Sequence, residues 1–210
     1  MLSRRVVVTA GAVLLFAAAW PSRSQAQDDT WADHTGFVLR LQGGGYSPLA
    51  HLDDSDLVDF KTGFNLGGGA AYQINRYVAV RANFTWARAE GRDQTASLLS
   101  GIAGMKFNRF LYDGDVQLRY PFRSGVAPYV FAGGGGITTR RPEAFTATTF
   151  RDRSFTKGAG KLGLGVSYQL PASGVGVYAE GATWVYKWDR LGFNKTQYDT
   201  AWSGGISYRF

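Results

Sequence analysis

Eight segments with a two-residue apolar–polar alternation, links of alternately short and long length, and an aromatic C-terminal residue predict an all-β chain. The predicted fold is an eight-stranded antiparallel up-and-down transmembrane β-barrel, preceded by a cleaved signal peptide. The 28 glycines and six prolines disfavour long helices and suit strands separated by turns. A length of 210 residues suggests one domain.

The N-terminal segment has the pattern of a secretory signal peptide. Two arginines precede an apolar run over residues 6–20, and small residues follow just before a predicted cleavage site after Ala26. A retained membrane anchor is the alternative, but no stop-transfer pattern follows. We therefore expect a signal peptide over residues 1–26, a periplasmic lead-in over 27–34 and the barrel domain over 35–210.

Composition narrows the classes of protein and partner. The chain has no cysteine, so no disulfide stabilises the exported protein. A formal net charge of +7 in an exported, aromatic-rich chain favours membrane-surface phosphates over nucleic acid as partners. Beyond residue 26 no apolar run approaches the roughly 20 residues of a spanning helix. That absence would suit a soluble protein, but the alternation along the strands favours a barrel in a membrane.

The first four predicted strands cover residues 36–46, 63–74, 77–88 and 110–122. The first two each contain three consecutive glycines, which suit the tight bending of a small barrel. Successive side chains of a strand point to opposite faces. In the third strand, Val80 and Phe84 therefore share an apolar face opposite Arg81, and in the fourth Val116 and Leu118 lie opposite the polar face.

The last four predicted strands cover residues 126–138, 158–170, 175–187 and 197–210. The fifth contains the glycine run 133–136, which does not resemble a phosphate-binding loop because neither Lys-Ser/Thr nor a helix follows it. The eighth strand alternates most regularly, with aromatic and aliphatic side chains opposite small and charged ones.

The links between strands alternate in length. Links 75–76, 123–125 and 171–174 are short, whereas 47–62, 89–109, 139–157 and 188–196 are long. Short periplasmic turns and long external loops are typical of bacterial outer-membrane barrels. Backbone groups in hydrocarbon need partners, so the first strand should pair with the last. The link 89–109 contains apolar residues, and an additional strand pair there would give ten strands.

With these features the chain resembles the family of small outer-membrane proteins of the OmpA and OmpX type, described as the outer membrane protein β-barrel domain. The resemblance covers residues 35–210 and is sharpest over 202–210. It implies a location in the outer membrane of a Gram-negative envelope. It also implies recognition of the last strand by the barrel assembly machinery, through Trp202, Ile206, Tyr208 and Phe210.

Every second side chain of a strand points to the same face, and we call this odd or even position the parity of the residue. Parity places seven charged side chains on the inner face: Arg40, Arg81, Asp113, Asp115, Arg119, Lys161 and Glu180. Small barrels are filled by side chains, and an unpaired buried ion costs several kcal/mol. We therefore expect an interior network of ion pairs. The expected function is that of a monomeric, non-enzymatic barrel in envelope structure or surface interaction. The alternative is a narrow pore that opens when these pairs rearrange.

One long link is strongly basic. It carries Arg140, Arg141, Arg151, Arg153 and Lys157. The nearest phosphates outside an outer membrane belong to lipopolysaccharide, so we expect an electrostatic contact with that lipid. The first long link is acidic but lacks the spacing and the bidentate glutamate of a calcium loop. We expect no metal and no cofactor.

Three further alternatives remain open. A lipid A-modifying enzyme would need a nucleophile and an oriented base, yet the only two histidines, His34 and His51, are not in a His-x-Ser arrangement beside a strand. A soluble lipocalin-like barrel would have the reverse sidedness, with an apolar interior. An adhesin or immune-facing protein would use the same barrel and bind through its loops.

Overall fold

The computed structural model describes residues 35–48, 60–91, 106–140, 154–171, 173–188 and 195–210. The predicted signal peptide, the lead-in and both histidines lie outside this part of the chain. The strands are β1 (Gly36–Pro48), β2 (Phe60–Gln73), β3 (Val78–Gly91), β4 (Lys106–Arg119), β5 (Val126–Arg140), β6 (Ser154–Gln169), β7 (Val175–Trp188) and β8 (Lys195–Arg209).

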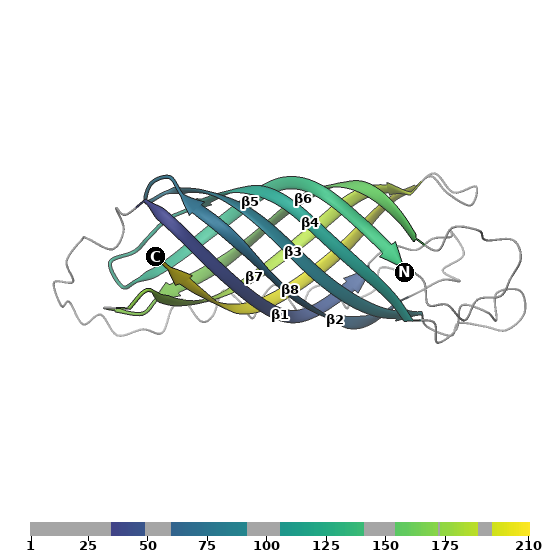
Figure 1. Cartoon of the computed structure of the whole chain (residues 1–210), viewed down its shortest axis with the longest axis horizontal. Coiled ribbons are helices and arrows are strands. Elements are labelled where there is room, and N and C mark those ends of the chain that lie inside the picture. Colours follow the sequence, from purple (N-terminus) through teal and green to yellow (C-terminus); the bar gives the residue numbers. More distant parts are fainter. Residues whose placement is uncertain (1–34, 49–59, 92–105, 141–153, 172, 189–194) are drawn as a thin grey trace, which may run out of the picture.

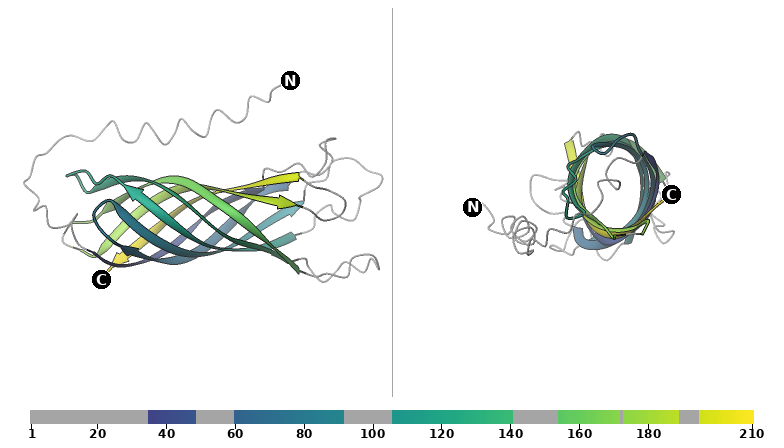
Figure 2. Two further views of the ribbon diagram at one scale, coloured as in Figure 1. Left: turned by 90° about the horizontal axis from the view of Figure 1, so that it is seen from above. Right: turned by 90° about the vertical axis from the view of Figure 1, so that its left-hand side faces the viewer.

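The strands form a closed barrel in sequence order, and every neighbouring pair is antiparallel (Figure 1). Closure is made by β1 and β8, which pair from Val38 opposite Arg209 to Pro48 opposite Asp199. The view along the barrel axis in Figure 2 shows the resulting ring of strands. The predicted fold class is therefore confirmed. Because β3 pairs directly with β4 in this closed order, the barrel has eight strands rather than ten.

The strands extend further than predicted at the end of the long links. β3 continues to Gly91 and β4 starts at Lys106, where Glu90 lies opposite Lys106. Backbone pairing continues there although the apolar alternation has ended, which is why sequence periodicity missed these residues. The strands are 13 to 16 residues long. A tilted strand needs only about 9–11 residues to cross the hydrocarbon core.

At the opposite end of the barrel, short turns connect consecutive strands. After β2, the Asn75 side-chain oxygen accepts hydrogen bonds from the amides of Tyr77 and Val78, at 2.8 and 2.9 Å. Between β4 and β5, the Gly125 amide donates to the Phe122 carbonyl at 3.1 Å. Gly125 has a φ of 80°, a conformation that side-chain-bearing residues rarely adopt. The Asn75 side chain and the conformation of Gly125 thus stabilise these short turns.

The outer wall is mostly apolar, whereas the inner wall combines charged and polar side chains with buried apolar ones. On β1, Leu39 and Leu41 are exposed outward, Leu41 by 64%, whereas Arg40 between them is buried. The same alternation runs along β3, β4 and β8. Within the described residues, no helix is long and apolar enough to span a bilayer.

Candidate functional site in the barrel lumen

Glu180 of β7 lies at the centre of the lumen. Its Oε2 accepts hydrogen bonds from Arg40 Nη2 at 2.7 Å, from Arg81 Nη1 at 3.0 Å and from the Tyr129 hydroxyl at 3.0 Å. These donors come from β1, β3 and β5. One carboxylate oxygen therefore ties together residues on four strands.

Asp115 of β4 is the second carboxylate in the lumen that binds several donors. Arg81 contacts it through two nitrogens, with Nε on Oδ1 and Nη2 2.8 Å from Oδ2. Lys161 Nζ donates to Asp113 Oδ1 at 2.7 Å and to Asp115 Oδ2 at 3.2 Å. The Asn83 amide also donates to both aspartates, at 2.8 and 3.1 Å. Every ionised side chain here is buried and paired, as the cost of an isolated buried charge requires.

We call this group the central network. It consists of Arg40, Arg81, Asn83, Asp113, Asp115, Tyr129, Lys161 and Glu180. Three cations face three carboxylates, so its formal charge is zero. It draws side chains from β1, β3, β4, β5, β6 and β7.

Glycines on β5 leave space for the Lys161 side chain, which extends from β6 past β5 to the aspartates of β4. Lys161 of β6 pairs with Gly133 of β5, and Gly133 and Gly135 pair with Asp115 and Asp113 of β4. A Cβ at Gly133 would lie 2.5 Å from the Asp115 Cα, and one at Gly135 would lie 2.6 Å from the Asp113 Cα. The lysine thus extends over the part of β5 where the inward positions, Gly133 and Gly135, have no side chain. This gives the glycine run of β5 a role in the lumen that the sequence alone did not indicate.

Aromatic rings lie against the guanidinium groups of Arg40 and Arg81 in the central network. The Arg40 guanidinium carbon lies 3.9 Å from the centroid of the Tyr178 ring, and that of Arg81 lies 4.1 Å from the Phe131 centroid. Each ring in turn lies over a glycine, since a Cβ at Gly205 would approach the Tyr178 Cζ to 2.6 Å and one at Gly163 would approach the Phe131 Cζ to 2.3 Å. Cation–π contact and shape together hold the arginines in place.

A second cluster lies nearer the end of the long links, and sequence analysis missed it. Arg109 Nη1 donates to the hydroxyls of Tyr46 and Tyr186, at 2.9 and 3.0 Å, and pairs with Asp199 Oδ2. The Tyr46 hydroxyl also donates to Asp199. We call these four residues the rim cluster. Asp199 was not among the seven predicted inner charges, although it shares its face of β8 with Ser203, and Arg109 fell in a predicted loop, so the pair was not evident.

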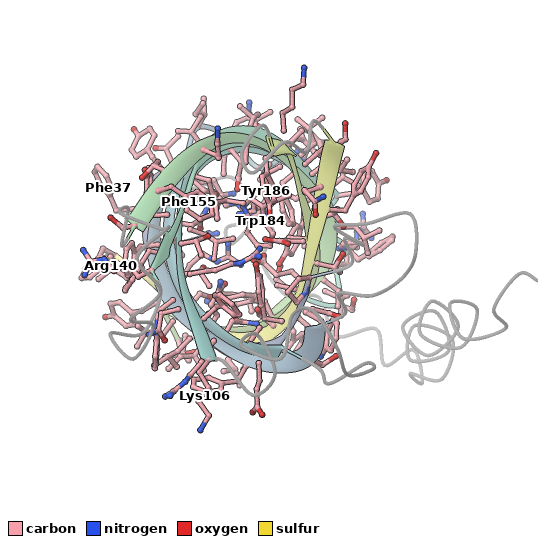
Figure 3. The ribbon with its side chains drawn as sticks, turned by 90° about the vertical axis from the view of Figure 1, so that its right-hand side faces the viewer. Phe37, Lys106, Arg140, Phe155, Trp184 and Tyr186 are labelled. Atoms are coloured by element: carbon pink, nitrogen blue, oxygen red, sulfur yellow. The ribbon has the colours of Figure 1, made fainter. Side chains whose placement is uncertain are left out.

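Buried apolar side chains separate the two clusters. On β4, Leu111 lies between Arg109 and Asp113, and on β7 Trp184 lies between Glu180 and Tyr186. Ile137 and Phe155 belong to the same buried group. Figure 3 shows Phe155, Trp184 and Tyr186 pointing into the barrel. The lumen therefore contains a charged layer, an apolar layer and a second charged layer.

Six of the seven predicted inner charges lie in the central network, and Arg119 does not. Arg119 lies at the short-turn end, where its Nε donates to the Arg76 carbonyl at 2.9 Å. Its position at the end of β4 removes it from the carboxylates, which lie further along the strand.

The predicted basic loop is only partly within the described residues. Arg140 is exposed on the outer wall of β5. Lys157 has the inward parity of Phe155 and Lys161 on β6, so it points to the mouth of the lumen. Arg141, Arg151 and Arg153 lie outside the described residues.

The predicted assembly signal forms an exposed stripe on β8. Trp202, Ile206, Tyr208 and Phe210 all point outward, with Phe210 exposed by 73%. The rings of Tyr208 and Phe210 pack edge to face with centroids 4.9 Å apart, and the Phe210 amide donates to the Phe37 carbonyl at 3.1 Å. The terminal residue therefore belongs to the seam that closes the barrel.

Neither a candidate metal site nor a histidine lies in the part of the chain that the structure describes. The described residues contain no group of three or more His, Cys, Asp or Glu side chains able to hold a metal ion. His34 and His51, the two candidate bases, lie outside the described residues.

Comparison with known proteins agrees with this architecture. Residues 10–210 match the family described as outer membrane protein beta-barrel domain, while no curated protein matches the chain. Neisserial surface protein A (NspA) is 16% identical, with a TM-score of 0.58 over 83% of this chain and 97% of that one. Ail of Yersinia pestis, solved with the heparin analogue sucrose octasulfate, is 17% identical over 85% and 99%, with a TM-score of 0.49. OprG of Pseudomonas aeruginosa is 18% identical over 85% and 98%, with a TM-score of 0.47.

Proposed function

The chain belongs to the outer membrane protein β-barrel family, and we propose that it is a non-enzymatic barrel that contributes to envelope structure and presents its loops at the surface. The lumen is closed by side chains in this proposal. The protein therefore acts as a stable structural component of the envelope that holds its loops at the surface. Its barrel does not serve as an open channel.

The central network carries this proposal. Its paired, buried ions bridge five strands, and the Tyr129 hydroxyl adds a sixth, so a solute could pass only by separating these ions. Separating a buried pair leaves an uncompensated charge and costs about 3–5 kcal/mol. The apolar layer of Leu111, Ile137 and Trp184 adds a second obstacle to ions. The rim cluster adds a third.

A narrow pore remains the second candidate, because several buried polar atoms of the described residues lack hydrogen-bond partners, three of them in the central network and the apolar layer. These three are Arg40 Nη1, Asp113 Oδ2 and Trp184 Nε1. Buried polar groups generally have partners, and water entering the lumen is one source of them. Rearranged ion pairs around these atoms would allow a water-filled path.

Single-channel recording in planar bilayers distinguishes the two functions. We expect the wild-type barrel to be silent. A variant that truncates side chains in all three layers, Arg40→Ala/Glu180→Ala with Trp184→Ala and Arg109→Ala, should show conductance steps. Lys187→Ala removes an exposed cation from the outer face of β7 and serves as the matched control. Stable conductance of the wild type would contradict the closed lumen and favour the pore.

A further inference from the structure

The apolar outer wall ends at a single row on three neighbouring strands. Trp86 of β3 lies opposite Phe110 of β4, which lies opposite Thr138 of β5. One row further towards the long links, Arg88 lies opposite Asn108, and Asn108 lies opposite Arg140. An aromatic row followed by a basic row marks the boundary between hydrocarbon and headgroups.

Lys106 extends the basic row. It lies two residues beyond Asn108 on the same face of β4, and Figure 3 shows Lys106 and Arg140 outside the barrel wall. We call Arg88, Lys106 and Arg140 the outer basic patch. Glu90, opposite Lys106, is the only acidic side chain with outward parity among the described residues. None of the three cations forms an ion pair with a described carboxylate, and the patch keeps a net charge of +2 when Glu90 is counted.

The spacing of the patch fits a phosphate group. Neighbouring strands are about 4.8 Å apart, so the backbones of Arg88 and Arg140 are separated by about 10 Å. Two arginine side chains can span that distance and converge on one anion, to which each guanidinium can donate two hydrogen bonds. The Arg140 guanidinium carbon already lies 5.1 Å from the centroid of the Phe110 ring, which limits its freedom.

We propose that the outer basic patch binds the phosphates of lipid A in the outer leaflet, with Arg88 and Arg140 as the main contacts and Lys106 as a supporting charge. This inference rests on the outer-membrane location in the proposed function. Short turns face the periplasm in such barrels, so the patch at the opposite end lies at the outer leaflet. Acyl chains of the same lipid would pack on Trp86 and Phe110 beneath it. The site differs from the basic loop of the sequence prediction and shares only Arg140 with it.

Native mass spectrometry of the full barrel in detergent tests the site with two probes, diphosphoryl lipid A and the same lipid without phosphates. We expect the wild type to prefer the phosphorylated lipid at least tenfold. The Arg88→Gln/Arg140→Gln variant should lose about twenty-fivefold in affinity for it, because each cation near an anionic lipid surface contributes about fivefold. Arg123→Gln, which removes an exposed cation from the short turn at the opposite end of the barrel, should bind like the wild type.

Three results would overturn the proposal. They are equal wild-type affinity for both lipids, unchanged affinity in the double variant, and displacement of lipid A by equimolar inorganic phosphate, which would indicate a soluble-anion site. The comparison of lipids needs no variant, so a folding defect leaves the test intact. Conductance of the wild type would refute the closed lumen without affecting this binding result, so the two proposals fail separately.

Discussion

Replacing Lys161 with methionine removes the cation between two buried aspartates while preserving most of the side-chain volume. Only 3% of the Lys161 side chain and 1% of the Asp113 side chain are exposed, so solvent cannot replace the lost charge. Asp113 would keep the Asn83 amide, and Asp115 would keep Arg81. Removing one partner of a buried pair costs about 3–5 kcal/mol, and we expect a loss of this size in the free energy of unfolding.

A compensating change tests whether this loss comes from the charge. In the Lys161→Met/Asp113→Asn variant, the uncompensated carboxylate becomes a neutral amide that Asn83 can still contact. We expect this double variant to recover most of the lost stability, which gives a coupling energy of about 2–3 kcal/mol in the double-mutant cycle.

Urea unfolding in lipid vesicles, followed by tryptophan fluorescence, measures these free energies. Lys187→Met on the exposed outer face of β7 is the control and should change stability by less than about 0.5 kcal/mol. A loss below about 1 kcal/mol for Lys161→Met, or no recovery in the double variant, would refute the view that this ion pair stabilises the lumen.

Three further predictions follow from the packing of the barrel. Gly205→Ala should lower the free energy of unfolding by about 1–3 kcal/mol, because its Cβ would lie 2.2 Å from the Leu41 carbonyl oxygen and 2.6 Å from the Tyr178 Cζ. Gly204→Ala, whose Cβ would lie 3.8 Å from the nearest atom, should be close to neutral in the same assay. Arg109→Met should cost about 3–5 kcal/mol because Asp199 is fully buried, and adding Asp199→Asn should restore most of it; equal stability of both variants would exclude the rim cluster as an ionic contact. Deleting Phe210 should lower the fraction of heat-modifiable, folded barrel in cells more than it lowers refolding into detergent, and an equal effect on both would contradict an assembly signal.

Strand faces could be predicted from sequence because the two-residue period is a property of the extended backbone. Arg81, Asp115 and Glu180 have inward parity and are buried in the lumen. Their pairing could not be predicted, because it depends on the stagger between strands. Glu180 of β7 meets Arg40 and Arg81 across the lumen, and no sequence separation encodes that contact.

The rim cluster escaped prediction for a different reason. Arg109 lies beyond the apolar alternation of β4, so its segment had the pattern of a loop, although its backbone continues the ladder opposite Thr139. Arg119 shows the opposite error. Its parity is inward, but parity gives no height along the barrel axis, and it lies with Arg76 at the short-turn end. Faces are therefore readable from sequence, whereas register and height need the structure.

The sidedness of β8 tests the whole account most directly. The natural chain has no cysteine, so single cysteines at 201–204 and 206–208 can each carry a fluorophore whose quenching by brominated lipid reports contact with acyl chains. Gly205 is left unchanged, because a Cβ there would clash with the Leu41 carbonyl oxygen. We predict strong quenching at 202, 204, 206 and 208 and weak quenching at 201, 203 and 207. Quenching with the opposite phase, or without a two-residue period, would contradict a lipid-facing apolar wall around a charged lumen.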